Sequence, residues 1–195
     1  MVVISNRTLI GLVAMLIAGV FIFRVSQSPT EETALNPVCP GSPARVHARC
    51  EMKVFFPSST TCQTIVEEVT ARLNHENRWE DPHSKGKYSL LSSSQPTTDE
   101  KTGAEVVYFI KGSRLTGNGK YTDLVNLQLT EKNGICVLEI CSESQVTSIL
   151  DFSTNYCNAH NLYCNEETCN AIHHSLEYKE EYENCSQNKV SKCDS

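Results

Sequence analysis

DLVNLQLTEKNGICVLEICSE, residues 123–143, is the stretch of the sequence that decides the fold. Asn133-Gly134 stands between two alternating runs and is typical of the type I′ turn that joins two antiparallel strands. A two-residue loop fixes the pairing of the strands and places Leu129 opposite Leu138. One face of the predicted hairpin is then apolar and carries Val125, Leu127, Leu129, Cys136, Leu138 and Ile140. The turn and the hydrophobic pattern give the same register independently, so we expect one face of this hairpin to lie in the core.

The flanking sequence predicts a helix and further strands. Residues 50–56 alternate between apolar and polar side chains, which is typical of a half-buried strand. Residues 58–75 have the apolar spacing of an amphipathic helix, with Thr60 and Gln63 as a capping box. Between this helix and the hairpin we expect strands at 87–91 and 105–111 and a turn or bulge at 112–120.

A second, short helix is predicted over residues 155–163, with Asp151 or Thr154 as its cap. The sequence after Cys164 is acidic and irregular, and three cysteines hold it. The predicted fold class is therefore α+β. We expect an antiparallel sheet of roughly four to five strands with one packed helix, a second short helix and a C-terminal tail stapled by disulfides.

An uninterrupted apolar run near the N-terminus, residues 8–23, is flanked by Arg7 and Arg24. The run is short for a membrane-spanning helix, which needs about 20 residues, and long for a signal-peptide core of about 7 to 15. A poor cleavage site and two arginines that can snorkel favour an uncleaved signal anchor. The alternative is a signal peptide that is removed, which would make the protein secreted.

Both interpretations place most of the chain in the secretory lumen or outside the cell. Residues 25–46 contain four prolines among Ser, Thr and Glu and cannot form a core, so they read as a stalk. The predicted single-pass organisation has a short cytoplasmic N-terminus (1–7), a transmembrane signal anchor (8–24), the stalk (25–46), an extracytoplasmic α+β domain (47–165) and an acidic tail (166–195).

Ten cysteines follow the apolar run, and an even number in an exported domain predicts disulfides. They are Cys39, Cys50, Cys62, Cys136, Cys141, Cys157, Cys164, Cys169, Cys185 and Cys193. Geometry excludes three pairings. A strand of six residues spans about 20 Å and separates Cys50 from Cys62. Cys136 and Cys141 point to opposite faces of one strand, and Cys157 and Cys164 lie two helical turns apart, about 10 Å.

A zinc site is the alternative for the cysteines near the C-terminus. Its ligands would come from Cys157, Cys164, Cys169, His160, His173 and His174. The spacing fits paired zinc ligands only loosely, and the sequence lacks the Cys-x-x-Cys motif typical of redox proteins. We therefore expect disulfides, with no metal and no cofactor.

The charge of the chain argues against a nucleic-acid partner. Arg7 and Arg24 are the only basic residues before Glu31, so the outer part keeps 15 of the 17 basic residues against 23 acidic ones, a net charge of −8. A phosphate backbone would be repelled by such a surface. Asn184-Cys185-Ser186 fits the sequon for N-glycosylation, which agrees with an exported domain.

A cluster of short polar residues follows the predicted hairpin, where the strand gives way to a helix. Its members are Ser142, Ser144, Asp151 and Asn155. These residues are the candidate binding site for a small polar group. The same residue types satisfy backbone N–H groups in turns and caps, and this structural role is the favoured interpretation because no histidine lies among them to complete a catalytic triad.

The run CSESQVTSILDFSTNYCN, residues 141–158, is similar to the signature of a large uncharacterised family, domain of unknown function fourteen ninety-nine. That signature reads S-x-S-R-x-G-x-x-D-x-G-x-N-R after a strand. The matching residues are Ser142, Ser144, Asp151 and Asn155, with one extra residue before Asp151. Three positions depart from the pattern, namely Gln145, Ser153 and Tyr156. The resemblance covers residues 50–162 and implies an α+β domain without supplying an activity.

The leading functional hypothesis is a non-enzymatic binding or interaction domain, displayed on a stalk and anchored in the membrane by the N-terminal helix. Its partner would be an unknown protein or a small ligand. An anchor, a stalk and a stapled domain are typical of display, and no motif indicates catalysis.

Two alternatives belong to other functional classes. A hydrolase would use either Asp81 and His83, a carboxylate and imidazole near Trp79, or Ser144 and Asp151. The simpler interpretation of the first pair is an exposed loop that Trp79 anchors to the core. A carrier of a small apolar ligand would use a gap between helix and sheet lined by Val66, Val69, Phe109, Leu127 and Leu138, positions that are usually core.

Overall fold

The structure is a computed structural model of the 195-residue chain, and it describes residues 39–94, 96–98 and 106–194. The predicted cytoplasmic residues 1–7, the predicted anchor at 8–24 and most of the predicted stalk lie outside the described residues. Among the helices that the structure describes, none is both long and apolar enough to cross a membrane.

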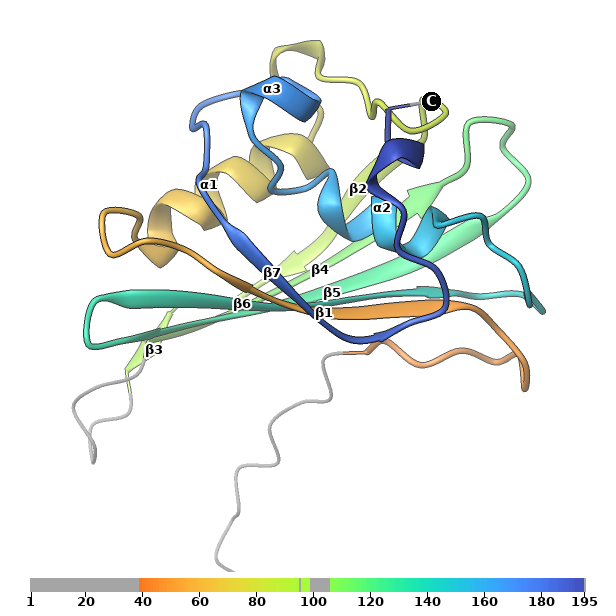
Figure 1. Ribbon diagram of the computed structural model, residues 1–195, viewed down its shortest axis with the longest axis horizontal. Helices are drawn as coiled ribbons and strands as arrows, with labels where there is room; N and C mark the ends of the chain where they lie inside the picture. Colours follow the sequence, from red (N-terminus) through yellow and green to blue (C-terminus); the bar gives the residue numbers. More distant parts are fainter. Residues whose placement is uncertain (1–38, 95, 99–105, 195) are drawn as a thin grey trace, which may run out of the picture. The chain divides into compact units, whose positions relative to one another are not determined.

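One antiparallel sheet forms the framework of the domain (Figure 1). Its strands are β1 (Arg49–Phe55), β2 (Lys87–Ser93), β3 (Thr97–Thr98), β4 (Val106–Leu115), β5 (Thr122–Lys132), β6 (Ile135–Ser144) and β7 (Lys179–Cys185). The strand order is β2-β4-β5-β6-β1-β7, and β3 pairs with β4. The predicted fold class is confirmed in outline, but the predicted number of strands was too small, since the described part of the sheet has seven.

The predicted hairpin is present in the predicted register. Leu129 pairs with Leu138, and Lys132 with Ile135, on either side of the two-residue turn. Asn133 and Gly134 have φ values of 54° and 73°, as a type I′ turn requires. The six apolar residues that were expected on one face are all buried in the core.

Helix α1 (Cys62–Leu73) packs on the sheet with its apolar stripe, as predicted. Its N-cap is Thr61 and not Thr60, because the Thr61 hydroxyl accepts the backbone N–H of Thr64 at 3.2 Å. The predicted capping box is therefore wrong, and the side chain of Gln63 instead donates to Glu67 one turn later.

Strand β4 continues through Gly112, where the sequence predicted a turn or bulge. A Cβ atom at Gly112 would lie 2.8 Å from a methyl carbon of Leu73 in α1. The missing side chain at Gly112 thus lets α1 pack closely on β4. The chain turns only after Leu115.

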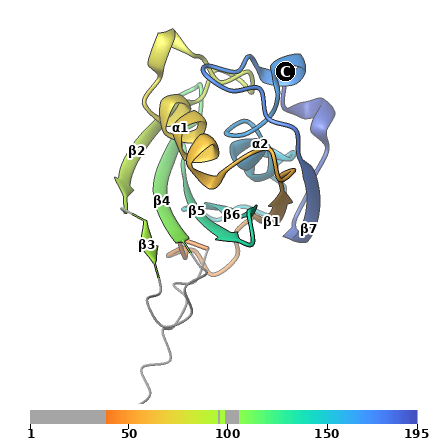
Figure 2. The same ribbon diagram turned by 90° about the vertical axis from the view of Figure 1, so that its left-hand side faces the viewer.

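Helix α2 (Thr154–His160) covers the same face of the sheet as α1, over β6 and β1 (Figure 2). The second predicted helix is therefore present, although it ends at His160 and its N-cap is Ser153 rather than the predicted Asp151 or Thr154. The other helical segments are α3 (Glu166–Cys169), η1 (Glu76–Arg78) and η2 (Val190–Lys192).

The C-terminal residues belong to the fold, which corrects the predicted boundary after residue 165. Strand β7 pairs with β1 and forms one edge of the sheet. Leu176 and Cys193 are buried in the core. Charged residues dominate β7, as they do on many edge strands, so its sequence lacks the alternating pattern that predicts a strand.

All ten cysteines are described, and all are paired. The disulfides are Cys39–Cys141, Cys50–Cys185, Cys62–Cys136, Cys157–Cys193 and Cys164–Cys169. The prediction of a disulfide framework is confirmed, and none of the three pairings that geometry excluded occurs. The cysteines considered as zinc ligands are thus bonded to sulfur.

Candidate functional site

The four polar residues of the candidate site meet at the side chain of Asn155. Its Oδ1 accepts a hydrogen bond from Ser142 Oγ at 2.8 Å. Its Nδ2 lies 3.0 Å from both Ser144 Oγ and Asp151 Oδ2, and 3.2 Å from the carbonyl oxygen of Ala48. All five residues are buried. The cluster therefore exists as predicted, but it lies inside the domain between α2 and the sheet.

Asp151 fixes the start of α2. One carboxylate oxygen accepts the backbone N–H of Asn155 at 3.1 Å, and the other accepts that of Ser153 at 3.3 Å. A carboxylate at the first turn of a helix satisfies backbone donors that have no partner within the helix. The geometry agrees with the structural interpretation of this residue.

A second layer of polar groups, which the sequence analysis missed, continues from this cluster. Asn158 donates to Asp123 at 2.8 Å and to Ser142 at 3.1 Å. Asn161 donates to Asp81 at 2.8 Å. Positions 155, 158 and 161 lie on one face of a helix, and all three are asparagine. This spacing was the sequence signal that could have indicated the second layer.

Asp81 and His83 do not form a catalytic pair. Asp81 is buried, and its carboxylate accepts a hydrogen bond from Nε of Arg114 at 2.7 Å. The carboxylate of Asp81 accepts the backbone N–H of His83 at 3.1 Å and does not contact the imidazole ring. The ring nitrogen Nδ1 of His83 instead lies 2.7 Å from the carbonyl oxygen of Lys192. Burial, and then the charge of Arg114, lower the pKa of His83. These contacts hold the loop against the domain.

Trp79 anchors the same loop, as the simpler interpretation proposed. Its side chain is buried, and its indole N–H lies 3.2 Å and 3.1 Å from the carbonyl oxygens of Cys169 and Asn170. The aromatic ring thus connects the segment after α1 to α3.

His160, which the sequence offered only as a possible zinc ligand, lies beneath a surface pocket. His160 Nδ1 lies 2.6 Å from Glu180 Oε1, and Tyr163 donates to the same oxygen at 2.7 Å. Burial, and then Glu180, raise the pKa of Tyr163 well above its usual value. Neither Glu180 nor Tyr163 stood out in the sequence, because they meet only through the pairing of β7 with the rest of the sheet.

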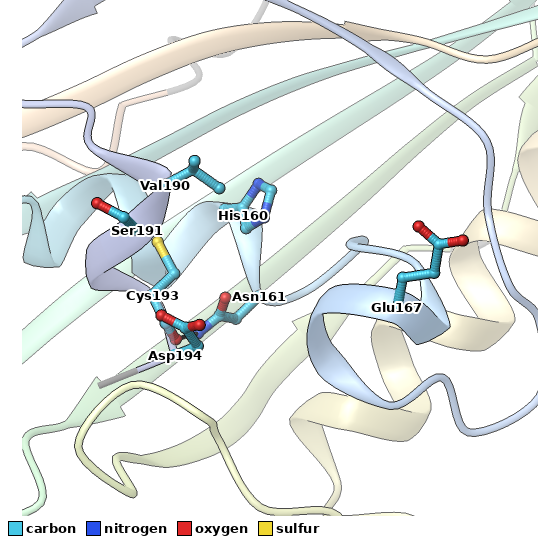
Figure 3. Close-up of a pocket in the computed structure, with 7 residues that line it drawn as sticks. All are labelled: His160, Asn161, Glu167, Val190, Ser191, Cys193 and Asp194. Atoms are coloured by element: carbon cyan, nitrogen blue, oxygen red, sulfur yellow. Dashed lines mark hydrogen bonds between the residues drawn. The ribbon is translucent and has the colours of Figure 1, made fainter.

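The pocket above His160 has a volume of about 210 Å³. It is lined by His160, Asn161, Glu167, Val190, Ser191, Cys193 and Asp194 (Figure 3). The second ring nitrogen of His160, Nε2, is itself buried and has no hydrogen-bond partner in the described part of the chain. Across residues 39–94, 96–98 and 106–194, no group of three or more His, Cys, Asp or Glu residues is placed to hold a metal ion.

The loop between β6 and α2, residues 145–153, carries an exposed apolar cluster that we name the apolar loop. Ile149, Leu150 and Phe152 are 75%, 65% and 71% exposed. Asp151 and Ser153, which alternate with them, are buried. Phe152 and Ser153 adopt left-handed backbone conformations with φ values of 51° and 70°. The polar cluster thus faces inward, and the large apolar side chains of the same segment face solvent.

The sequence contained a signal for this loop. Residues 146–152 read VTSILDF, an apolar segment placed where turn residues end a strand. Its spacing fits neither the strand before it nor the helix after it, so a surface loop was the remaining choice.

Comparison with models of known protein families, with characterised proteins and with solved structures found no match for this chain. The resemblance of residues 141–158 to the uncharacterised family stays a prediction.

Proposed function

We propose that residues 39–194 form a non-enzymatic, extracytoplasmic binding domain and that the apolar loop is its binding surface. The observation that carries the proposal is the exposure of Ile149, Leu150 and Phe152 side by side on one loop. Clustered, exposed large apolar residues on a soluble domain mark interaction sites, and buried apolar anchors supply most of the energy of an interface. Five disulfides support an oxidising compartment outside the cytoplasm.

The loop is held in one conformation before it meets a partner. Asp151 is hydrogen-bonded to the start of α2, and Ser153 Oγ accepts the backbone N–H of Lys189 at 3.1 Å. Left-handed backbone at a non-glycine residue such as Phe152 costs about 1–3 kcal/mol, and such strain is concentrated at functional sites. A loop that is already ordered loses little conformational entropy on binding.

A hydrolase is less well supported. The hydroxyl of Ser144 accepts from Asn155, and Asp151 accepts the backbone N–H of Asn155, so both side chains are committed to internal hydrogen bonds. Asp81 is committed to Arg114 and Asn161 in the same way. A substrate would have to displace α2 to reach these groups.

A carrier of an apolar ligand also has little support. Val69, Leu127 and Leu138 are fully buried members of one continuous core. Phe109, which was expected to line the same gap, alternates with the buried Tyr108 and Ile110 and therefore lies on the other face of the sheet. A ligand between α1 and the sheet would have to separate packed side chains.

Site-specific photocrosslinking tests the proposal. A benzophenone side chain replaces Phe152 in the chain expressed through the secretory pathway, and a matched variant carries it at Leu91, which is 58% exposed on β2. We expect a covalent adduct, with protein or with lipid, at position 152 and not at position 91. Adding Leu150→Ser should remove the adduct, because it takes away a neighbouring apolar contact.

Two results would contradict a binding role for the loop. One is the absence of any adduct at position 152, and the other is an adduct that Leu150→Ser leaves unchanged. Unaltered thermal unfolding of the variants must accompany either result, so that a damaged fold is not mistaken for a lost contact.

A further inference from the structure

We propose that the apolar loop binds the surface of a lipid bilayer, with Ile149, Leu150 and Phe152 inserted at the boundary between headgroups and acyl chains. The inference rests on the proposed function, because it names the partner of the same loop. It is argued from where the described chain begins, from the charges around the loop and from the way the loop is supported.

The first described residues run along β6 to the apolar loop (Figure 1). Cys39 is bonded to Cys141 in β6, and the backbone N–H of Gly41 donates to Glu143 at 2.6 Å. The carbonyl oxygen of Val46 accepts the N–H of Ser148, inside the loop, at 3.2 Å. The chain from Cys39 onward, drawn in orange, therefore leads to the same end of the sheet as the loop (Figure 1).

The sequence before Cys39 contains the predicted membrane anchor. Residues 25–38 separate the two, and 14 residues span at most about 50 Å when fully extended. A domain tethered within that distance meets the bilayer at a high effective concentration, so a weak apolar contact is enough to hold the loop there.

The charges around the loop suit a lipid headgroup region. Asp151 is the only charged residue among positions 145–153, and it is buried. Glu143, two residues before the loop, is buried and hydrogen-bonded to His47, whereas two exposed residues near the loop are basic. Arg45 precedes the exposed Val46, and Lys189 donates its backbone N–H to Ser153. Both basic residues are exposed, although the outer chain as a whole is acidic. Basic residues beside an inserted apolar tip interact favourably with lipid phosphates.

The exposed apolar area extends beyond the loop tip. Val46 is exposed next to Ser148, and Val146 is exposed at the start of the loop. The structure therefore presents a protruding apolar edge rather than a groove. A protruding edge can enter the headgroup region of a membrane, whereas the deep anchors of a protein interface need a partner with a matching pocket.

Quenching by brominated lipid tests the inference. The whole chain carrying Phe152→Trp is reconstituted in phosphatidylcholine bilayers with brominated acyl chains, and Leu91→Trp on β2 is the matched control. Trp79, the only native tryptophan, is buried and gives the same background in both proteins. We expect the added emission at position 152 to fall by about half or more and to shift to shorter wavelength, while position 91 stays unquenched. Ile149→Ser in the Phe152→Trp protein should reduce the quenching.

Equal quenching at positions 152 and 91, or full access of iodide to position 152 in the bilayer, would overturn the bilayer proposal. The crosslinking result separates this failure from that of the proposed function. A protein adduct at position 152 that depends on Leu150, without lipid quenching, leaves the loop as a binding surface and replaces the bilayer with a protein. The absence of both signals removes both proposals.

Discussion

At the scale of single residues, Asn155 connects the inside of the domain to its exposed loop. Its amide oxygen accepts a hydrogen bond from Ser142, and its amide nitrogen donates to Ser144 and Asp151. An amide accepts with its oxygen and donates with its nitrogen, whereas an ionised carboxylate lacks the donor and an alkyl side chain lacks both. The conformation of the apolar loop therefore depends on the amide of Asn155, through Asp151.

Replacing Asn155 by alanine should destabilise the domain by about 2–4 kcal/mol, because it leaves buried hydroxyl and carboxylate groups without partners. The free energy of unfolding, measured by denaturant titration, checks this. Asn188→Ala is the matched control, since Asn188 is exposed, and it should change stability by less than about 0.5 kcal/mol. Equal effects of the two substitutions would refute the structural role of the cluster.

Glu68 gives the domain an acid-sensitive contact. Burial alone would raise its pKa, but the backbone N–H groups of residues 172–174 and the charge of Arg72 bring the pKa below its usual value. Because the unfolded chain then binds protons more readily than the folded one, Glu68 stabilises the fold above the pKa of a free glutamate. This stability is lost as the pH falls through its lower, folded pKa.

Stability should therefore decline with acid below about pH 4.5, and the decline should be shallower in Glu68→Gln. Urea unfolding between about pH 6 and pH 3 measures the two slopes. Glu80→Gln, at an exposed position, should keep the slope of the original protein. An unchanged slope in Glu68→Gln would mean that this carboxylate is not the acid-sensitive group.

Part of the candidate site could be found in the sequence and part could not. Ser142, Ser144, Asp151 and Asn155 lie within one short segment, so their meeting followed from a strand, a turn and a helix. Asp81 and Asp123 reach the same helix only through the packing of a distant loop and the pairing of β5 with β6. Nothing in their local sequence indicates that packing.

At the scale of secondary-structure elements, β7 shows why a strand can escape prediction. Its sequence is KEEYENC, without the alternation of a half-buried strand. Glu180 points under α2 and is hydrogen-bonded there by Tyr163 and Tyr156, where the pattern would require an apolar residue. A half-buried carboxylate with aromatic partners thus hides the period of the strand.

The disulfide between Cys50 and Cys185 should hold β7 on the edge of the sheet. Replacing both cysteines by alanine should cost about 3–4 kcal/mol and should speed amide hydrogen exchange in residues 179–185. The hairpin of β5 and β6 should keep its protection, because its hydrogen bonds are internal to the sheet. Mass spectrometry of exchanged peptides resolves the two regions.

Alanine at both Cys164 and Cys169 is the control for that experiment. This disulfide closes a sequence separation of only 5 residues, so its loss should cost about 2 kcal/mol and should not expose β7. Uniformly faster exchange over the whole sheet in the Cys50 and Cys185 variant would contradict a local role for the bond.

The turn of the hairpin depends on a glycine. Gly134 has a φ of 73° and open space around it, so Gly134→Ala meets backbone strain without a clash. The expected loss is about 1 kcal/mol, measured by thermal or denaturant unfolding. Asn133→Gly at the adjacent left-handed position should be close to neutral, and a neutral Gly134→Ala would show that the turn has another conformation in solution.

At the scale of the whole molecule, disulfides connect both ends of the described chain to the body of the domain, one end to the sheet and the other to a helix. Cys39 near the start is bonded to β6, and Cys193 near the end is bonded to α2. Alkylation of the secreted protein under denaturing conditions should therefore find no thiol, and the intact mass should be lower by ten hydrogens. Two or more alkylated cysteines would show that a pair is open and would identify it.

The fold class was accessible from sequence, and the connectivity of the disulfides was not. The hairpin, α1 and α2 follow from local patterns, so an α+β domain with an antiparallel sheet could be predicted. Strand geometry also excluded the pairs Cys50–Cys62 and Cys136–Cys141. Choosing among the remaining pairings requires the position of β7, which brings Cys185 to Cys50 and which no local pattern revealed.

The bond between Cys39 and Cys141 also decides how the domain bears a pulling force. Tension applied to the chain before Cys39 passes through sulfur directly into β6, and not along the backbone of residues 40–48. β6 is hydrogen-bonded to β5 on one side and to β1 on the other. A load entering at a central strand must shear two ladders at once, whereas a load entering at an edge strand would unzip one ladder bond by bond. A pull on Cys39 would therefore be resisted by both hydrogen-bonded ladders of β6.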